Sequence, residues 1–70
     1  MKNKISERLQ GLLNEEKMPI IKLAAELGVA YSVVYNWVHG NTTPNADYII
    51  AICDYFHVSS DYLLGISDNY

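Results

Sequence analysis

A short stretch near the middle of the chain, YSVVYN, carries side chains suited to reading DNA base edges. Asn36 can donate and accept hydrogen bonds at once, which matches the adenine edge in the major groove. Ser32 can bond a base edge or a phosphate, and the methyl groups of Val33 suit a thymine methyl. Tyr31 and Tyr35 can offer a ring to bases or a hydroxyl to phosphate. We therefore expect these five side chains to face DNA bases.

The cations of the chain all lie upstream of that stretch. The sequence has five Lys and Arg against eight Asp and Glu, with a net charge of −3. All five cations fall within residues 1–22, and every formally charged side chain in residues 23–70 is acidic. Because the stretch lacks arginine, the commonest reader of guanine, we expect an A·T-leaning or weakly selective site. With about three to four phosphates neutralised per domain, the slope of the logarithm of the DNA-binding constant against the logarithm of the salt concentration should be roughly −3.

A second group of residues suits phosphate rather than bases. Two lysines supply charge, one residue at a helix start supplies its backbone N–H, and three polar residues of a loop supply hydroxyl, amide and backbone N–H groups. The expected phosphate contacts are Lys17, Ile20, Lys22, Asn41, Thr42 and Thr43.

Two short helices must position these residues. The segment LAAELGVAYSVVYNWVHG predicts helices over about 20–27 and 30–38, joined by a tight turn at Gly28. Leu23, Leu27, Val34 and Trp37 recur where both helices must face a shared core. A helix, a sharp glycine turn and a second helix form the geometry that places one helix in the DNA major groove.

The rest of the chain predicts further short helices and no strands. Asn45 and Ser59 or Ser60 are expected N-caps, and Gly65 is expected to end the last helix. Half of the residues are apolar, which suffices for one compact core. We expect one all-α domain over 1–70, with a short tail at 66–70 and additional helices at about 3–16, 46–56 and 60–64.

Other classes of function find no support in the residues. No apolar run approaches the roughly 18 residues of a membrane span, and the N-terminus lacks the apolar region of a signal peptide. The single cysteine, Cys53, lies in an apolar run and is expected to be a buried, inert thiol. His39 and His57 lack partners at metal-binding spacing. We expect a cytoplasmic protein without catalytic residues, metal, cofactor or small-molecule ligand.

Three spaced signals resemble the Cro and phage-repressor (lambda-repressor-like, XRE) helix-turn-helix family. They are LAAELGV, the W-x-x-G of Trp37 and Gly40 followed by Pro44, and FHVSSDYLLG. The resemblance covers about residues 6–68. It implies a compact five-helix DNA-binding domain with 30–38 as the recognition helix. The family's second helix usually opens with a phosphate-binding glutamine, whereas this chain has Ile20 there.

The resemblance also implies a two-fold dimer on a palindromic operator. The C-terminal region is more apolar and aromatic than a core of this size requires, although Leu63 and Leu64 can instead simply close the core. The expected dimer interface consists of Tyr55, Tyr62, Leu64, Ile66 and Tyr70.

Two functions remain open from the sequence. The first is a sequence-specific DNA-binding transcriptional regulator of bacterial or phage origin, a repressor that blocks or recruits polymerase by occupying a promoter. The alternative is a protein-interaction module on the same scaffold, such as an antirepressor or an antitoxin. The absence of Lys and Arg after Lys22 favours the alternative.

Overall fold

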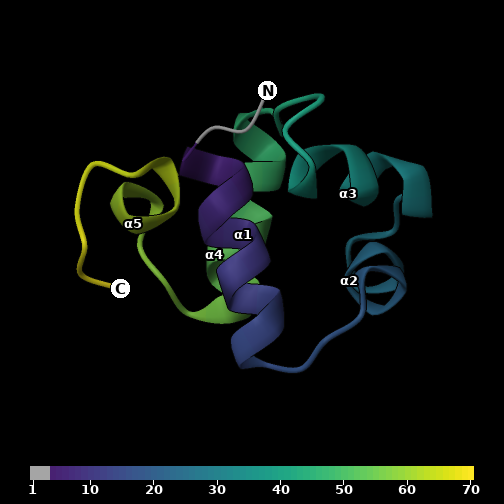
Figure 1. The fold of residues 1–70 in the computed structure, drawn as a ribbon, viewed down its shortest axis with the longest axis horizontal. Coiled ribbons are helices and arrows are strands. Elements are labelled where there is room, and N and C mark those ends of the chain that lie inside the picture. The colour runs from purple at the N-terminus through teal and green to yellow at the C-terminus, as the bar shows by residue number, and fades with distance from the viewer. Residues whose placement is uncertain (1–3) are drawn as a thin grey trace.

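The structure is a computed structural model that describes residues 4–70. The predicted all-α fold with five helices is confirmed, and no strand occurs among these described residues. The start expected for the first helix, at Asn3, lies outside them. The helices in Figure 1 are α1 (Lys4–Glu15), α2 (Ile20–Leu27), α3 (Tyr31–Val38), α4 (Ala46–Phe56) and α5 (Ser60–Leu64).

Local signals at the helix ends explain why most of the predicted boundaries are correct. The side chain of Asn45 accepts a hydrogen bond from the N–H of Tyr48 and begins α4. The hydroxyl of Ser59 accepts from the N–H of Tyr62 in the same way and begins α5. Such side-chain caps satisfy N–H groups that the first turn of a helix leaves without a partner. α3 begins one residue later than predicted, because Ala30 has an extended backbone and forms its N-cap.

Each helix contributes one completely buried side chain to a shared core. From α1 to α5 these side chains are Leu9, Leu23, Val34, Ile52 and Leu63. The predicted core residues Ala24 and Trp37 are also buried, and the Trp37 ring lies 5.3 Å from the Tyr48 ring on α4. Leu27 is only partly buried against this core. The core therefore ties both helices of the predicted pair to the rest of the chain.

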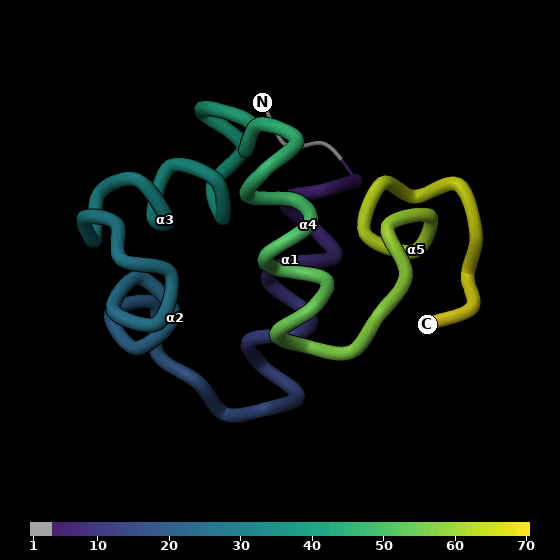
Figure 2. Tube along the Cα trace, turned by 180° about the vertical axis from the view of Figure 1, so that it is seen from behind, coloured from purple at the N-terminus to yellow at the C-terminus, as the bar shows by residue number. Residues whose placement is uncertain are grey.

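The helices separate two surfaces of the molecule. In Figure 1, α2 and α3 lie on one side of α1, whereas α5 and the C-terminal segment lie on the other side, and the reverse view in Figure 2 shows the same separation. The molecule measures 29 Å along this direction. A contact confined to the C-terminal segment would therefore leave α3 uncovered.

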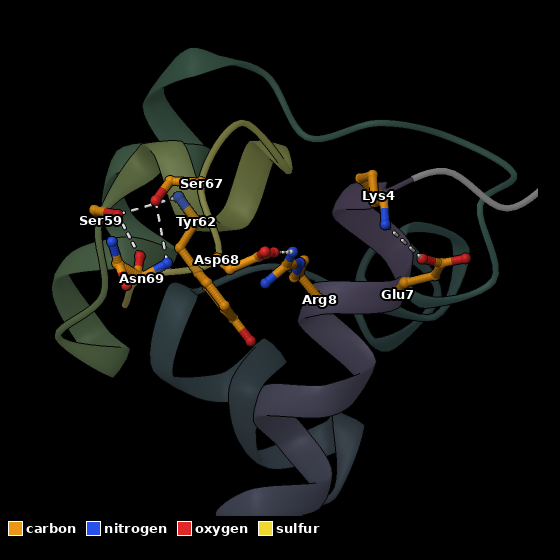
Figure 3. Close-up of polar contacts among 8 residues, drawn as sticks. All are labelled: Lys4, Glu7, Arg8, Ser59, Tyr62, Ser67, Asp68 and Asn69. Atoms are coloured by element: carbon orange, nitrogen blue, oxygen red, sulfur yellow. Dashed lines mark hydrogen bonds and ion pairs between the residues drawn. The ribbon is translucent and has the colours of Figure 1, made fainter.

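The short tail expected at 66–70 contacts α1. The Arg8 guanidinium contacts Asp68 at 2.8 Å and lies 4.3 Å from the centre of the Tyr62 ring (Figure 3). The Tyr70 ring lies 4.5 Å from the Tyr62 ring, and the Tyr70 hydroxyl donates to Glu15 at 2.7 Å. We call these five residues the C-terminal clasp.

The contacts of the C-terminal clasp shift three of its pKa values, and the hydrogen bond to Asp68 raises that of Arg8. The hydrogen bond from Arg8 stabilises the carboxylate of Asp68 and lowers its pKa. The hydrogen bond to Glu15 stabilises the protonated phenol of Tyr70 and raises the pKa of Tyr70. Both shifts favour the charge states that form the clasp, an ionised Asp68 and a protonated Tyr70.

Two glycines end helices, and the single cysteine is buried. Gly28 and Gly65 have the left-handed backbone predicted for helix ends. Cys53 is buried as expected, and burial raises the pKa of its thiol, which disfavours the reactive thiolate. Within residues 4–70 no helix combines the length and apolar character needed to cross a bilayer.

Candidate nucleic-acid interface

The turn between α2 and α3 is built around Gly28. Its φ of 71° lies in the left-handed region, which costs glycine little because glycine has no Cβ. The N–H of Gly28 bonds to the carbonyl of Ala25, and the N–H of Val29 bonds to that of Ala24. These bonds end α2 and redirect the chain into α3. The structure therefore contains the helix, sharp turn and helix that the sequence predicts.

The inner and outer faces of α3 differ as the residue spacing predicts. Val34, Trp37 and Val38 are buried, so the inner face is fixed against the core. Tyr31, Ser32 and Tyr35 are exposed on the outer face, with 49% of Tyr31 and 41% of Tyr35 accessible to solvent. Val33 was expected outside but is half-buried, because it packs against the edge of the core.

Asn36, the fifth expected base-reading residue, connects α3 to the loop that follows. Its side-chain oxygen accepts a hydrogen bond from the Asn41 amide at 3.2 Å. Its backbone carbonyl accepts from the N–H groups of Asn41 and Thr42. Asn36 thus fixes the start of the loop that carries three expected phosphate contacts, and it is itself only half-exposed. Thr43 continues the same exposed loop.

A row of rings runs along the outer face of α3. The centres of the Tyr31 and Tyr35 rings are 6.0 Å apart, and those of the Tyr35 and His39 rings are 4.1 Å apart. Sequence reasoning considered His39 only as a metal ligand and missed this neighbour. The spacing of four residues between successive rings was the available signal, since such residues share a helix face.

The starts of α2 and α3 differ from those of α4 and α5. Pro19 and Ala30 are the N-caps of α2 and α3, and neither provides a side-chain hydrogen bond to the helix. The first N–H groups of both helices therefore lack the side-chain caps that α4 and α5 possess. Uncapped N–H groups and the positive end of the helix dipole favour an anion such as phosphate. Ile20 can take part only through this backbone.

The structure distributes the cations unevenly between this interface and the rest of the surface. Lys17 and Lys22, the two expected phosphate contacts with charge, are exposed near α2. Lys22 lies 3.9 Å from Glu26 on the same helix. Arg8 contacts Asp68 in the C-terminal segment, which lies on the opposite side of α1 from α3 in Figure 1. Lysine rather than arginine must therefore supply the charge at this interface.

The expected dimer residues do not form one exposed surface. Tyr62 is buried beneath Arg8 and Tyr70, so in this single chain it does not offer the surface expected for a dimer contact. Tyr55 is half-buried and contacts the edge of Phe56. Leu63 is buried in the core, as the simpler alternative predicted, whereas Leu64, which that alternative also placed there, is exposed. The expected residues that remain exposed are Leu64, Ile66 and Tyr70.

The fold, the glycine turn and the exposed outer face of α3 together define a helix-turn-helix DNA-binding domain. A comparison with known families agrees, because the family model described as Helix-turn-helix matches residues 9–63. The chain belongs to this helix-turn-helix family of DNA-binding regulators, of the XRE and lambda-repressor-like type. Comparisons with curated proteins and with solved structures find no match.

Proposed function

We propose that this chain is a sequence-specific transcriptional repressor of bacterial or phage origin, which inserts α3 into the major groove of its operator. The observation that carries the proposal is the contrast between the two faces of α3. The inner face is buried, while the outer face exposes Tyr31, Ser32 and Tyr35 without cover from another helix. We take residues 1–70 as one helix-turn-helix domain, and we expect it in the cytoplasm, where bacterial DNA lies.

Bases and phosphates would be contacted by different parts of the interface. Tyr31, Ser32 and Tyr35 point outward from α3 and would meet base edges, with Val33 and Asn36 at the border of that face. The uncapped helix starts and the two exposed lysines would bind phosphates on one side. The loop fixed by Asn36 would bind them on the other. The latter contacts would come from Asn41, Thr42 and Thr43.

We further propose a homodimer on a palindromic operator. Leu64, Ile66 and Tyr70 leave apolar surface exposed at the end of the molecule opposite α3, with 73% of Ile66 accessible. A two-fold contact there would leave both copies of α3 free for successive half-sites, which supports this arrangement. Repression would then follow from occupation of a promoter.

A mobility-shift titration tests the DNA-binding proposal. The probe is a duplex that contains the inverted repeat found upstream of the gene, titrated at 50 mM and 200 mM salt. We expect salt-sensitive binding that Ser32→Ala weakens about five- to tenfold, because one base contact is lost. Ile50→Ala is the matched control, since Ile50 is exposed on α4 and is not part of the interface. Equal binding by all three proteins would refute the assignment of α3.

A specific observation favours a second function, a protein-interaction module such as an antirepressor or antitoxin. The clasp occupies Arg8, and Lys22 lies beside Glu26, so few cations remain for DNA phosphates. An absence of DNA binding at 50 mM salt, together with a stable complex with another protein, would favour this function over repression.

A further inference from the structure

The outer face of α3 combines two unusual features. Between Glu26 and Asp47 the sequence contains no Asp, Glu, Lys or Arg. The same segment exposes a continuous row of three rings from Tyr31, Tyr35 and His39, which we call the aromatic ridge. A helix face that enters the groove without formal charge must discriminate bases by shape and apolar contact more than by charge.

We propose that the aromatic ridge acts as one preformed unit in DNA recognition, that His39 is a positioning residue which holds the Tyr35 ring, and that the ridge reads thymine methyl groups. This inference rests on the proposed function of the chain as a DNA-binding repressor.

The position of His39 explains how it can hold Tyr35. His39 is the C-cap of α3, and its N–H bonds to the carbonyl of Tyr35. Its ring lies 4.1 Å from the Tyr35 ring at an angle of 39°. Since the loop after His39 is tied to Asn36, the backbone of His39 is held in place, and its ring lies against that of Tyr35. The Tyr35 ring is therefore restricted before DNA arrives.

The restriction of Tyr35 improves binding through entropy. An exposed tyrosine that is free to rotate loses this freedom when it is immobilised in a groove, which reduces affinity about two- to tenfold for one side chain. In the proposed arrangement, packing between Tyr31 and His39 already removes part of that freedom in the unbound protein. Removal of the His39 ring should therefore weaken DNA binding although His39 need not contact a base.

Thymine is the base whose groove edge fits such a ridge. It alone carries a C5-methyl group in the major groove, and this group is recognised by apolar contact. Burial of one methyl group against a ring raises affinity about fourfold. The ridge would thus favour A·T pairs at the positions that it covers.

Deoxyuridine substitution tests the proposed target. Wild-type protein first selects its preferred duplex from a random pool, and each thymine of that duplex is then replaced by deoxyuridine, which removes only the methyl group. We expect at least one replacement to weaken wild-type binding about fourfold. The same replacement should not affect Tyr35→Ala, which lacks the ring that the methyl group contacts.

Variants of His39 test its positioning role separately. His39→Ala should bind the selected duplex two- to tenfold more weakly than wild type, whereas His39→Phe, which restores a ring without its N–H groups, should bind within twofold. In the free protein, the NMR signals of the Tyr35 ring should shift in His39→Ala, because the ring current of its neighbour is lost. His57→Ala is the matched control, since it removes the other histidine, which caps α4.

Several results would overturn the inference. Unchanged binding by His39→Ala would refute the positioning role of the His39 ring. Binding by His39→Phe as weak as that of His39→Ala would refute the same role. Neither result would bear on the thymine target. Uniform tolerance of deoxyuridine would refute the thymine target. Failure of wild-type protein to select any duplex would instead refute the proposed repressor function and the target together, while the NMR shift would still decide whether the ridge exists.

Discussion

Three glycines provide a graded test of the packing between the two ends of the chain. An added Cβ would meet no atom within 4 Å at Gly11 or at Gly28, but at Gly65 it would lie 2.6 Å from both Cβ and Cγ of Lys4. Gly28 and Gly65 share the left-handed backbone, with φ values of 71° and 83°. Alanine at these positions therefore separates helix propensity, backbone strain and steric overlap.

The expected changes in the free energy of unfolding follow from these three contributions. Gly11→Ala should stabilise the protein by about 1 kcal/mol, because alanine is the better helix former inside α1. Gly28→Ala should destabilise it by about 1–2 kcal/mol through the left-handed backbone alone. Gly65→Ala adds an overlap with α1 that costs about 1–3 kcal/mol, for a total of about 2–5 kcal/mol.

Urea denaturation followed by circular dichroism measures all three variants. For a domain of this size 1 kcal/mol corresponds to about 4–8 °C in melting temperature, so thermal melts provide a second measurement. Lys4→Gly removes the overlapping atoms of the neighbour. The double variant Lys4→Gly with Gly65→Ala should recover the steric part of the loss but not the backbone strain. Equal losses for Gly28→Ala and Gly65→Ala, or no recovery in the double variant, would refute the close approach of α5 to α1.

Four further predictions concern single features of the fold and the interface. His57→Gly should raise the free energy of unfolding by about 0.5–1 kcal/mol in urea, because His57 has a left-handed φ of 58°. Trp37→Ala should cost about 3–5 kcal/mol, and a native melting curve for it would disprove the core assignment. Asp68 has a pKa below its ordinary value of 3.8, so wild type should exceed Asp68→Asn in stability above about pH 4 and lose this advantage as the pH falls through the lowered pKa. The salt slope of operator binding, measured by fluorescence anisotropy, should be roughly −3, and a much steeper slope would mean that more cations take part.

Local signals account for what could be predicted from the sequence. Asn45, Ser59 and Gly65 each act on residues within one helical turn, so the bounds of α4 and α5 follow from short stretches of sequence. The division of α3 into a buried and an exposed face follows equally from the spacing of Val34 and Trp37.

Contacts between distant residues account for what the sequence did not reveal. Tyr62 looks like a surplus aromatic residue until Arg8 and Tyr70 are known to cover it. No periodicity within one helix encodes the pairing of α1 with the C-terminal segment. His39 is an exception to this rule. Its spacing of four residues from Tyr35 predicts that the two rings share a helix face, but only metal binding was considered for His39.

The C-terminal clasp also bears on the order of folding. Its contact between Arg8 and Asp68 joins residues 60 positions apart, whereas α2 and α3 adjoin each other along the chain. Closing the longer loop loses more chain entropy, so the clasp should form after the helix-turn-helix pair and after the main barrier to folding. A contact that is absent from the transition state changes the unfolding rate and leaves the folding rate nearly unaltered. We therefore expect the clasp to affect how long a folded molecule persists more than how quickly it forms.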